Sequence, residues 1–264
     1  MKTKIPFKEK YGPFALVAGG SDGLGMAYSE ALARRGLNLV IIARNKEKLE
    51  ETAVQLRTQY GVEIKTLALD LADYEKTKSL ITELNVLIGL IVYNAAFAPI
   101  GLIENASEEN LSQAMMVNVR TPLLLANMLC PSMVQNKRGG IVLMSSLAGG
   151  QGCPRLAAYT ASKAFNAVLA EGLWAEMSRH GVDVIGCCAG AVLTPGYQQA
   201  GKNTKPAPGT MTARDVAEKT LRALGKGPIV IPGGMNKLAR FLFTRLLTRK
   251  AAISIMSKTT GGLT

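Results

Sequence analysis

One stretch constrains the fold of this chain more than any other: a short apolar run that passes directly into a glycine-rich loop and then into a helix. The apolar run covers residues 14–18, the loop covers residues 19–25, and the helix is predicted over residues 26–35. Glycines let the backbone approach a pyrophosphate, and a helix N-terminus offers free N–H groups and positive potential. The alternative is an ordinary tight turn. In the nucleotide-binding interpretation, the contacts come from Gly19, Ser21, Asp22, Gly23, Leu24 and Gly25.

Strand-length apolar runs and helical stretches alternate along the rest of the chain. Further strands are predicted at residues 39–43, 63–69, 88–93, 141–146, 182–188 and 229–231. Helices are predicted at residues 46–60, 73–84, 107–118, 122–136 and 156–180, with another beginning at Thr212. This alternation predicts an α/β fold, with one doubly wound parallel sheet of about seven strands flanked by helices. We expect residues 1–264 to form a single domain, because no linker, repeat or low-complexity segment interrupts the pattern.

Composition narrows the class of protein and its partners. A chain of 264 residues with 48% hydrophobic content can bury a substantial core. Four cysteines and one histidine without zinc spacing predict no metal site, reduced thiols and a cytoplasmic location. No stretch is apolar enough to span a bilayer, and the N-terminus does not resemble a secretory signal. A net charge of +12 favours anionic ligands, but nucleic acid is disfavoured because no recognised motif or interleaved aromatics accompany the charge.

Polar residues follow three of the predicted strands at the edge where open α/β sheets bind ligands. Arg44 ends the second strand, about 20 residues beyond the glycine loop, where an acid would bind a ribose hydroxyl and an arginine favours a 2′-phosphate. This predicts NADP(H), with a plain surface arginine as the alternative. The other candidates after the third and fourth strands are Asp70, Leu71, Asn94 and Ala95.

Tyr159 and Lys163 carry the candidate chemistry. They are four residues apart in a predicted helix and therefore share a face, where the ammonium should lower the pKa of the phenol. Ser146 ends a predicted strand and brings a hydroxyl to the same sheet edge. Asn118 interrupts an apolar run and is either a structural bridge or a site residue. The alternative without catalytic function is a solvated Tyr–Lys pair and a serine in a turn.

Together these signals, in this order and spacing from about Tyr11 to about Gly234, resemble the short-chain dehydrogenase/reductase family, nearest to its 3-ketoacyl-CoA reductase and 17β-hydroxysteroid dehydrogenase-like branch. The resemblance implies that Tyr159 is the general acid and that Ser146 hydrogen-bonds the reacting oxygen. It implies that Lys163 lowers the pKa of the Tyr159 phenol and binds the cofactor ribose. It also implies that Asn118 anchors a water behind the lysine, and that Val192 and Thr194 contact the nicotinamide end.

The activity implied by this resemblance is NADP(H)-dependent reduction of a ketone to a secondary alcohol, or the reverse, on a bulky apolar or acyl substrate. The alternative is a catalytically silent NADP(H)-binding sensor or scaffold on the same fold. Family members commonly pair through the helices predicted at residues 122–136 and 156–180, so a homodimer or homotetramer is expected. Ala18, Tyr93, Ala96 and Ala189 depart from the family pattern near the cofactor.

Two segments lie outside the regular alternation. Residues 190–211 contain prolines and glycines with few apolar anchors, which predicts a substrate loop. Residues 235–264 form a tail with no acidic residue, predicted to be a basic amphipathic helix over residues 236–257 with Leu238, Leu242 and Leu246 on one face. These leucines either pack on the domain or across a subunit interface, or lie in the surface of an anionic membrane as a peripheral contact.

Overall fold

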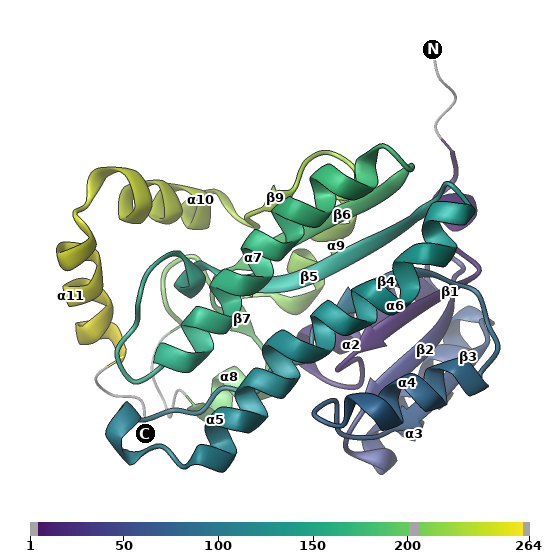
Figure 1. The fold of residues 1–264 in the computed structure, drawn as a ribbon, viewed down its shortest axis with the longest axis horizontal. Coiled ribbons are helices and arrows are strands. Elements are labelled where there is room, and N and C mark those ends of the chain that lie inside the picture. The colour runs from purple at the N-terminus through teal and green to yellow at the C-terminus, as the bar shows by residue number, and fades with distance from the viewer. Residues whose placement is uncertain (1–4, 201–205, 261–264) are drawn as a thin grey trace.

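The computed structural model describes residues 5–200 and 206–260. Its centre is a seven-stranded parallel sheet in the order β3-β2-β1-β4-β5-β6-β9 (Figure 1). The strands are β1 (Phe14–Ala18), β2 (Asn38–Ala43), β3 (Ile64–Ala68), β4 (Ile88–Tyr93), β5 (Gly139–Ser146), β6 (Val182–Ala189) and β9 (Ile229–Val230). The predicted doubly wound parallel sheet is therefore confirmed, with strand boundaries that differ by at most two residues from the expected ones.

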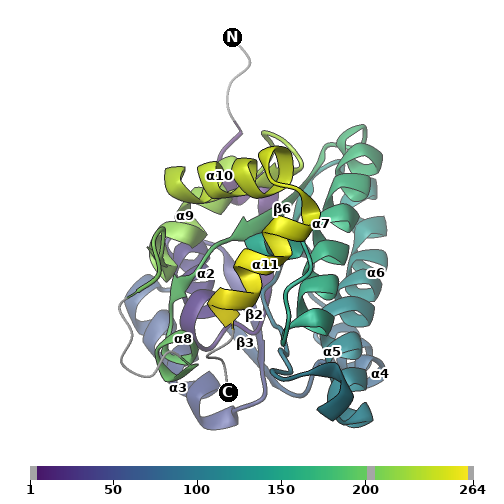
Figure 2. The ribbon, with the colours of Figure 1, turned by 90° about the vertical axis from the view of Figure 1, so that its left-hand side faces the viewer.

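Helices cover both faces of the sheet, and central strands such as β1 and β4 are therefore buried on both sides. One face carries α2 (Gly23–Ala33), α3 (Lys46–Tyr60) and α9 (Ala213–Ala223). The other carries α4 (Tyr74–Glu83), α6 (Thr121–Gln135) and α7 (Ala157–Ser178). Figure 2 shows the layers edge-on, with α2 and α9 on one side of β6 and α7 and α6 on the other. Alternate residues of β1, such as Val17 and Leu16, enter the two separate cores.

Side-chain caps determine where several helices begin. Asn45 Oδ1 accepts a hydrogen bond from Lys48 N at 2.9 Å and starts α3, while Asp73 Oδ1 accepts from Lys76 N at 3.0 Å and starts α4. Thr212 caps α9 in the same way, as its sequence predicted. Gly61 ends α3 with a left-handed φ of 64°.

Some elements were not predicted from the sequence. A short helix α1 (Phe7–Tyr11) precedes the first strand, and the 3₁₀ turns η1 (Ile103–Asn105) and η3 (Leu147–Gly150) lie in connections. The predicted helices over 107–118 and 122–136 are joined without a break. Between α5 (Glu108–Met115) and α6 lies one π-helical turn, η2 (Met116–Arg120). Such turns leave main-chain carbonyls free to make other contacts and often lie at functional sites.

The predicted substrate loop over residues 190–211 is more ordered than its composition indicated. It contains β7 (Val192–Leu193), α8 (Pro195–Ala200) and β8 (Met211–Thr212), and β7 pairs with β8. Residues 201–205 of this segment lie outside the described residues.

The tail differs from the single predicted helix. It consists of α10 (Gly234–Phe241), the π turn η4 (Leu242–Leu246) and α11 (Arg249–Thr260), with extended backbone at Leu247 between them. In Figure 1 the two helices form an arm beyond the carboxyl end of β5. Leu238, Leu242 and Leu246 are 58%, 38% and 64% exposed, so the alternative in which they pack on the domain is wrong. Residues 261–264 lie outside the described part of the chain, in which no helix is long and apolar enough to cross a bilayer.

Candidate active site

A cleft of about 510 Å³ opens where the carboxyl ends of β1 and β4 lie side by side. From this point the chain winds outward in both directions, and open α/β sheets bind ligands at such a switch point. Eleven of the predicted cofactor residues line the cleft: Gly19, Ser21, Asp22, Gly23, Leu24, Arg44, Asp70, Leu71, Asn94, Ala95 and Thr194. The predicted residues Gly25, Tyr159, Lys163 and Val192 are not among its lining.

The glycine loop is shaped by close backbone contacts. A Cβ atom placed on Gly25 would lie 1.7 Å from the carbonyl oxygen of Gly19, so only glycine fits at this first turn of α2. Two side chains hold the loop: Ser29 Oγ donates to Gly20 O at 2.9 Å, and Asn94 Nδ2 donates to Gly19 O at 3.2 Å. These bonds brace a loop that begins after Ala18, which has no hydroxyl of its own.

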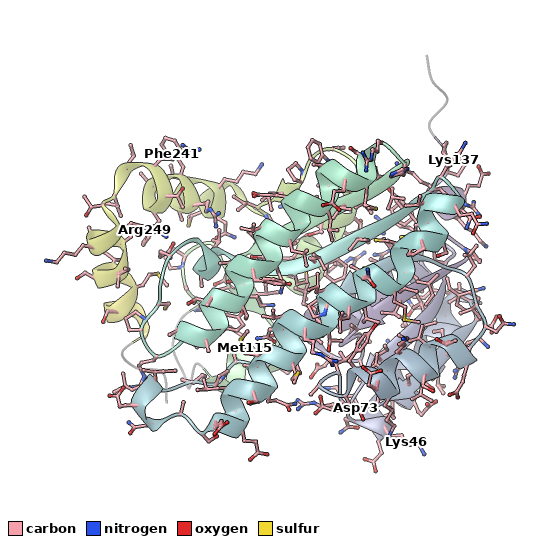
Figure 3. The ribbon with its side chains drawn as sticks, in the orientation of Figure 1. Lys46, Asp73, Met115, Lys137, Phe241 and Arg249 are labelled. Atoms are coloured by element: carbon pink, nitrogen blue, oxygen red, sulfur yellow. The ribbon has the colours of Figure 1, made fainter. Side chains whose placement is uncertain are left out.

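The cationic end of the cleft contains one residue that the sequence did not single out. Arg44 is exposed at the end of β2 and makes no salt bridge within the described residues. Lys48 lines the cleft as well, and its ammonium pairs with the Asp22 carboxylate at 2.6 Å. Because Asn45 caps α3, Lys48 falls in the first helical turn and faces back to the cleft. Lys46, the residue that follows Arg44-Asn45, is not among the lining residues. Figure 3 shows Lys46 at the outer margin of the molecule.

Asp70 lies in the cleft with both carboxylate oxygens engaged. Oδ1 accepts from Ala72 N at 2.9 Å, and Oδ2 accepts from the Gln113 side chain at 3.0 Å. Gln113 comes from α5, more than forty residues along the chain, so no local sequence signal pointed to this contact. The carboxylate is thereby held in place at the end of β3.

Thr194 closes the opposite side of the cleft. A Cβ on Gly23 would lie 3.0 Å from the Thr194 methyl carbon, which places the segment after β7 directly against the start of α2. The Thr194 hydroxyl accepts from Tyr197 N at 3.2 Å and so starts α8. Pro195 and Gly196 extend this wall.

Ser146, Tyr159 and Lys163 meet beside the cleft. Ser146 is the last residue of β5, and its hydroxyl accepts from Ala148 N at 3.2 Å. Tyr159 and Lys163 lie on α7, with the Lys163 ammonium 5.5 Å from the centre of the tyrosine ring. Lys163 Nζ donates to the Met144 carbonyl at 2.9 Å, which fixes the long side chain against β5.

The pKa of Tyr159 differs from the sequence expectation. Burial raises the pKa of its phenol, while a side-chain hydrogen bond with Ser146 acts in the opposite direction. Burial also lowers the pKa of Lys163 from 10.5 to about 8. The pKa of the phenol is therefore raised and not lowered as expected, with Ser146 and not the ammonium opposing the effect of desolvation, and the phenol keeps its proton at neutral pH.

Asn118 is fully buried in the π turn η2. Its side chain donates to Phe97 O at 2.7 Å and accepts from Phe97 N at 2.8 Å, and it also donates to Ser162 Oγ at 3.1 Å. These bonds tie the π turn to the segment after β4 and to α7. Asn118 is thus a bridge in this structure, and any role in the site acts through its position.

The departures from the family pattern have local explanations. Tyr93 ends β4 with a buried ring, and its hydroxyl donates to the Val117 carbonyl at 2.5 Å. Ala189 ends β6, and the following Gly190 packs against Asn236 of α10, whose Oδ1 would lie 2.7 Å from a Cβ at that glycine. Asn236 is buried and donates to Gly209 O and Pro232 O. The first turn of the tail is therefore anchored to the loop after β6. Ala96 lies in the cleft wall.

Within residues 5–200 and 206–260, no three His, Cys, Asp or Glu side chains gather closely enough to hold a metal ion. All four cysteines are buried. The chemistry of the site comes from the hydroxyl, phenol and ammonium groups described above.

Sequence comparison gives a family and several relatives. Residues 13–205 match the short chain dehydrogenase family. The 7beta-hydroxysteroid dehydrogenase of Clostridium sardiniense is 31% identical over 233 residues, which cover 88% of this chain and 89% of that protein. The very-long-chain 3-oxoacyl-CoA reductase of Phaeosphaeria nodorum is 33% identical over 238 residues, which cover 86% of this chain but only 66% of that reductase.

Two solved structures are also similar. One, from a study of 7beta-hydroxysteroid dehydrogenase stereoselectivity, superposes with a TM-score of 0.89 at 28% identity, over 96% of this chain and 99% of the other. A short-chain dehydrogenase from Sphingobium yanoikuyae in complex with NADPH gives a TM-score of 0.77 at 27% identity, over 89% and 96% of the two chains.

Proposed function

Because this chain belongs to the short-chain dehydrogenase/reductase family and is an oxidoreductase, we propose that it uses NADP(H) to reduce a ketone to a secondary alcohol, or to catalyse the reverse reaction. The observation that carries the proposal is the meeting of Ser146, Tyr159 and Lys163 beside the cleft. Ser146 provides a hydrogen-bond donor, Tyr159 provides a proton donor, and Lys163 provides a fixed positive charge.

The cleft fits NADP(H) in its backbone and in its charges. The glycine loop brings main-chain N–H groups and the start of α2 to the surface, because Gly25 leaves no side chain there. Arg44 provides a guanidinium without a salt bridge in the described residues, and Lys48 offsets the negative charge of Asp22. This cationic end would hold the 2′-phosphate. A solved relative with NADPH bound supports the choice of cofactor.

When bound, the reduced cofactor supplies a hydride to the carbonyl carbon. Tyr159 donates its phenolic proton to the carbonyl oxygen, and Ser146 Oγ donates a hydrogen bond to the same oxygen. The Lys163 ammonium, held by Met144 O, stabilises the phenolate that remains. Because burial raises the pKa of Tyr159, the resting phenol is protonated, which suits the direction of ketone reduction.

The proposed substrate is a bulky apolar ketone or alcohol, or an acyl derivative. Two relatives named for a hydroxysteroid and a very-long-chain 3-oxoacyl-CoA support this class. The segment over residues 190–211 is proposed to cover the substrate, because Thr194 already lies against the cleft. The catalytically silent alternative is less well supported, since the tyrosine, serine and lysine are all present.

The direct test is NADPH oxidation against 3-oxoacyl-CoAs of increasing length and oxosteroids, with NADP⁺ reduction by a 7β-hydroxysteroid as the reverse assay. Tyr159→Phe should lose at least a hundredfold in kcat while NADPH fluorescence titration gives a nearly unchanged Kd, because only the proton donor is removed. A near-normal rate in Tyr159→Phe would contradict the mechanism. No turnover with any ketone, together with tight NADPH binding, would favour the silent alternative.

A homodimer through α6 and α7 is proposed as the assembly. Both helices carry apolar side chains that are exposed in the single chain, namely Leu123 on α6 and Val168 and Trp174 on α7. Light scattering should give the mass of a dimer or tetramer. Val168→Asp should shift it toward the monomer if this face is the interface.

The arm is proposed to make a peripheral contact with an anionic membrane. Met235, Leu238, Leu242 and Leu246 are all exposed and recur at helical spacing on α10 and η4. The arm contains six basic residues and no acidic one, so two copies of this arm would repel each other across a twofold axis. An anionic surface attracts each nearby basic residue by about 1 kcal/mol. The charge therefore favours lipid over a second copy.

Cosedimentation with phosphatidylserine and phosphatidylcholine vesicles tests this contact. Leu238→Ser with Leu246→Ser should abolish binding to the anionic vesicles, whereas Val54→Ser, an equally exposed valine on α3, should not. Binding that is insensitive to the leucine substitutions would refute membrane contact through the arm. A change of oligomeric mass in the leucine variant would instead indicate that a second subunit covers this face.

A further inference from the structure

Another cavity lies at the β9 edge of the sheet and shares no lining residue with the cofactor cleft. It has a volume of about 340 Å³ and is lined by residues of α9, β9 and the start of α10. Figure 2 shows α9 and α10 next to each other. Four of the lining residues are basic and none is acidic: Lys219, Arg222, Lys226 and Lys237. The proposed reaction uses none of them.

The acidic residues of α9 do not neutralise this cavity. Glu218 accepts hydrogen bonds from the Arg34 and Arg35 side chains at 2.9 and 2.7 Å, so two arginines of another helix already balance its charge. Asp215 accepts a hydrogen bond from the hydroxyl of Thr212 at 2.8 Å, at the opposite end of α9 from the cavity.

The four basic side chains are therefore left with an excess of positive charge. All of them are exposed. Arg222 approaches one oxygen of Glu218 at 3.6 Å, and this is its only ion pair within the described residues. The other three form no ion pair in that part of the chain: Lys219, Lys226 and Lys237. Like charges around a hollow with protein walls concentrate counter-ions in it, so the cavity attracts anions.

The size and charge of the cavity suit a small anion that carries several negative charges. Its volume is near the lower end of the range for ligand pockets, which fits a small molecule or a single headgroup. A carboxylate brings one negative charge, whereas a phosphomonoester brings about 1.5 to 2 at neutral pH. Arginine and lysine side chains both bind phosphate oxygens through charge-assisted hydrogen bonds. About two phosphate groups would match the four basic residues.

The cavity adjoins the arm. Gly234 and Lys237 line the cavity and also belong to the first turns of α10. The residues that follow them in the chain, Met235 and Leu238, are among the exposed apolar side chains of the arm. The same two turns of helix thus present a cationic cavity and an apolar face. A surface that receives the apolar face would bring its headgroups close to the cavity.

We propose that this cavity binds an anion with phosphomonoester or diphosphate groups, held by the four basic residues that line it. A lipid headgroup and a soluble phosphate compound both offer this chemistry. The selection of a lipid headgroup rests on the proposed membrane contact of the arm. The binding of the anion itself depends neither on that contact nor on the proposed reaction.

The first test is calorimetric titration of the full-length protein with pyrophosphate, with NADPH present to occupy the cofactor cleft. Lys219→Gln with Lys226→Gln should weaken pyrophosphate binding about tenfold, because two of the four charges are removed. The matched control is Lys76→Gln with Lys78→Gln on α4, which removes two exposed lysines from the other face of the sheet and should leave the affinity unchanged. All four substituted side chains are exposed, so both variants should fold.

The second test uses phosphatidylcholine vesicles that contain either phosphatidic acid, a phosphomonoester, or phosphatidylserine, adjusted to equal surface potential. The unmodified protein should bind the phosphatidic acid vesicles more tightly. The variant with Lys219→Gln and Lys226→Gln should lose this preference. Leu238→Ser with Leu246→Ser should lose binding to both kinds of vesicle but keep its affinity for pyrophosphate, which separates the cavity from the apolar face of the arm.

The two tests together identify the source of the phosphate. Weakened pyrophosphate binding and a lost preference for phosphatidic acid in the cavity variant assign the site to a lipid headgroup. Weakened pyrophosphate binding without any preference for phosphatidic acid in the unmodified protein assigns it to a soluble phosphate compound. Equal pyrophosphate affinity of the unmodified protein and the cavity variant overturns the proposal. None of these measurements needs turnover, so a failure to reduce ketones would leave the result intact.

Discussion

Lys163 should make the protein less stable than a neutral side chain would, and the size of this penalty follows from its pKa. Burial lowers the pKa of Lys163 from 10.5 to about 8. A pKa shift of this size means that burying the charge lowers the free energy of unfolding by about 3 kcal/mol at neutral pH. Lys163→Met keeps most of the length of the side chain and removes the charge. It also removes the hydrogen bond to Met144 O, which is worth about 1 kcal/mol.

The expected net effect of Lys163→Met at pH 7 is a gain of about 2 kcal/mol in the free energy of unfolding, together with loss of activity. The sign depends on pH. Below about pH 8 the lysine is protonated in both the folded and the unfolded state, and the full penalty applies. Between about 8 and 10.5 the unfolded state binds more protons, so the unmodified protein gains stability as the pH rises. Above that window both states are neutral, and the variant should be the less stable by about 1 kcal/mol.

Urea unfolding of both proteins at pH 7, 9 and 11 measures the difference directly, because titrations that the two share cancel. A Lys163→Met variant that is less stable at pH 7 would refute the reasoning. A difference that does not change with pH would show that burial of the charge is not its cause.

Three further predictions concern the cleft and the helices beside it. Arg44→Asp should weaken NADPH binding by about ten- to hundredfold, because it removes a charge-assisted hydrogen bond to the 2′-phosphate. The variant should therefore prefer NADH. Equal affinity of the unmodified protein for NADPH and NADH would argue against the assignment. Gly25→Ala should abolish NADPH binding or folding, because its Cβ would lie 1.7 Å from Gly19 O, whereas Gly172→Ala, with open space on α7, should raise stability by up to about 1 kcal/mol. Glu218, hydrogen-bonded to Arg34 and Arg35, has its pKa lowered to about 2 by these bonds. Glu218→Gln should therefore lower the free energy of unfolding by about 1–2 kcal/mol at pH 7, after allowance for solvent screening. The difference in stability between the variant and the unmodified protein should shrink as the pH falls from 4.5 toward 2. A difference that does not change with pH would contradict this.

The sheet and its helices were determined by local sequence. The central strands are short apolar runs that must be buried on both faces, and several helices begin at a cap such as Asn45 or end at a glycine such as Gly61. These patterns require no knowledge of distant residues. The alternation of elements then leaves few topologies, because parallel crossovers have one hand. The same logic placed Gly19, Arg44, Asp70 and Asn94 at one edge, since they follow parallel strands.

Contacts between segments far apart in the chain were decided only by the tertiary structure. Gln113 of α5 reaches Asp70 at the end of β3, and Lys48 faces the cleft only because the cap at Asn45 determines where α3 begins. The pKa of Tyr159 depends on how much water is excluded, which spacing along a helix does not reveal, so burial raises this pKa although an ammonium lies nearby. The direction of the arm was decided in the same way. The helical spacing of Leu238, Leu242 and Leu246 predicted an apolar face, but not whether that face contacts the domain or the solvent. The buried side chain of Asn236 fixes the other side of α10 to the domain, so the leucines face the solvent.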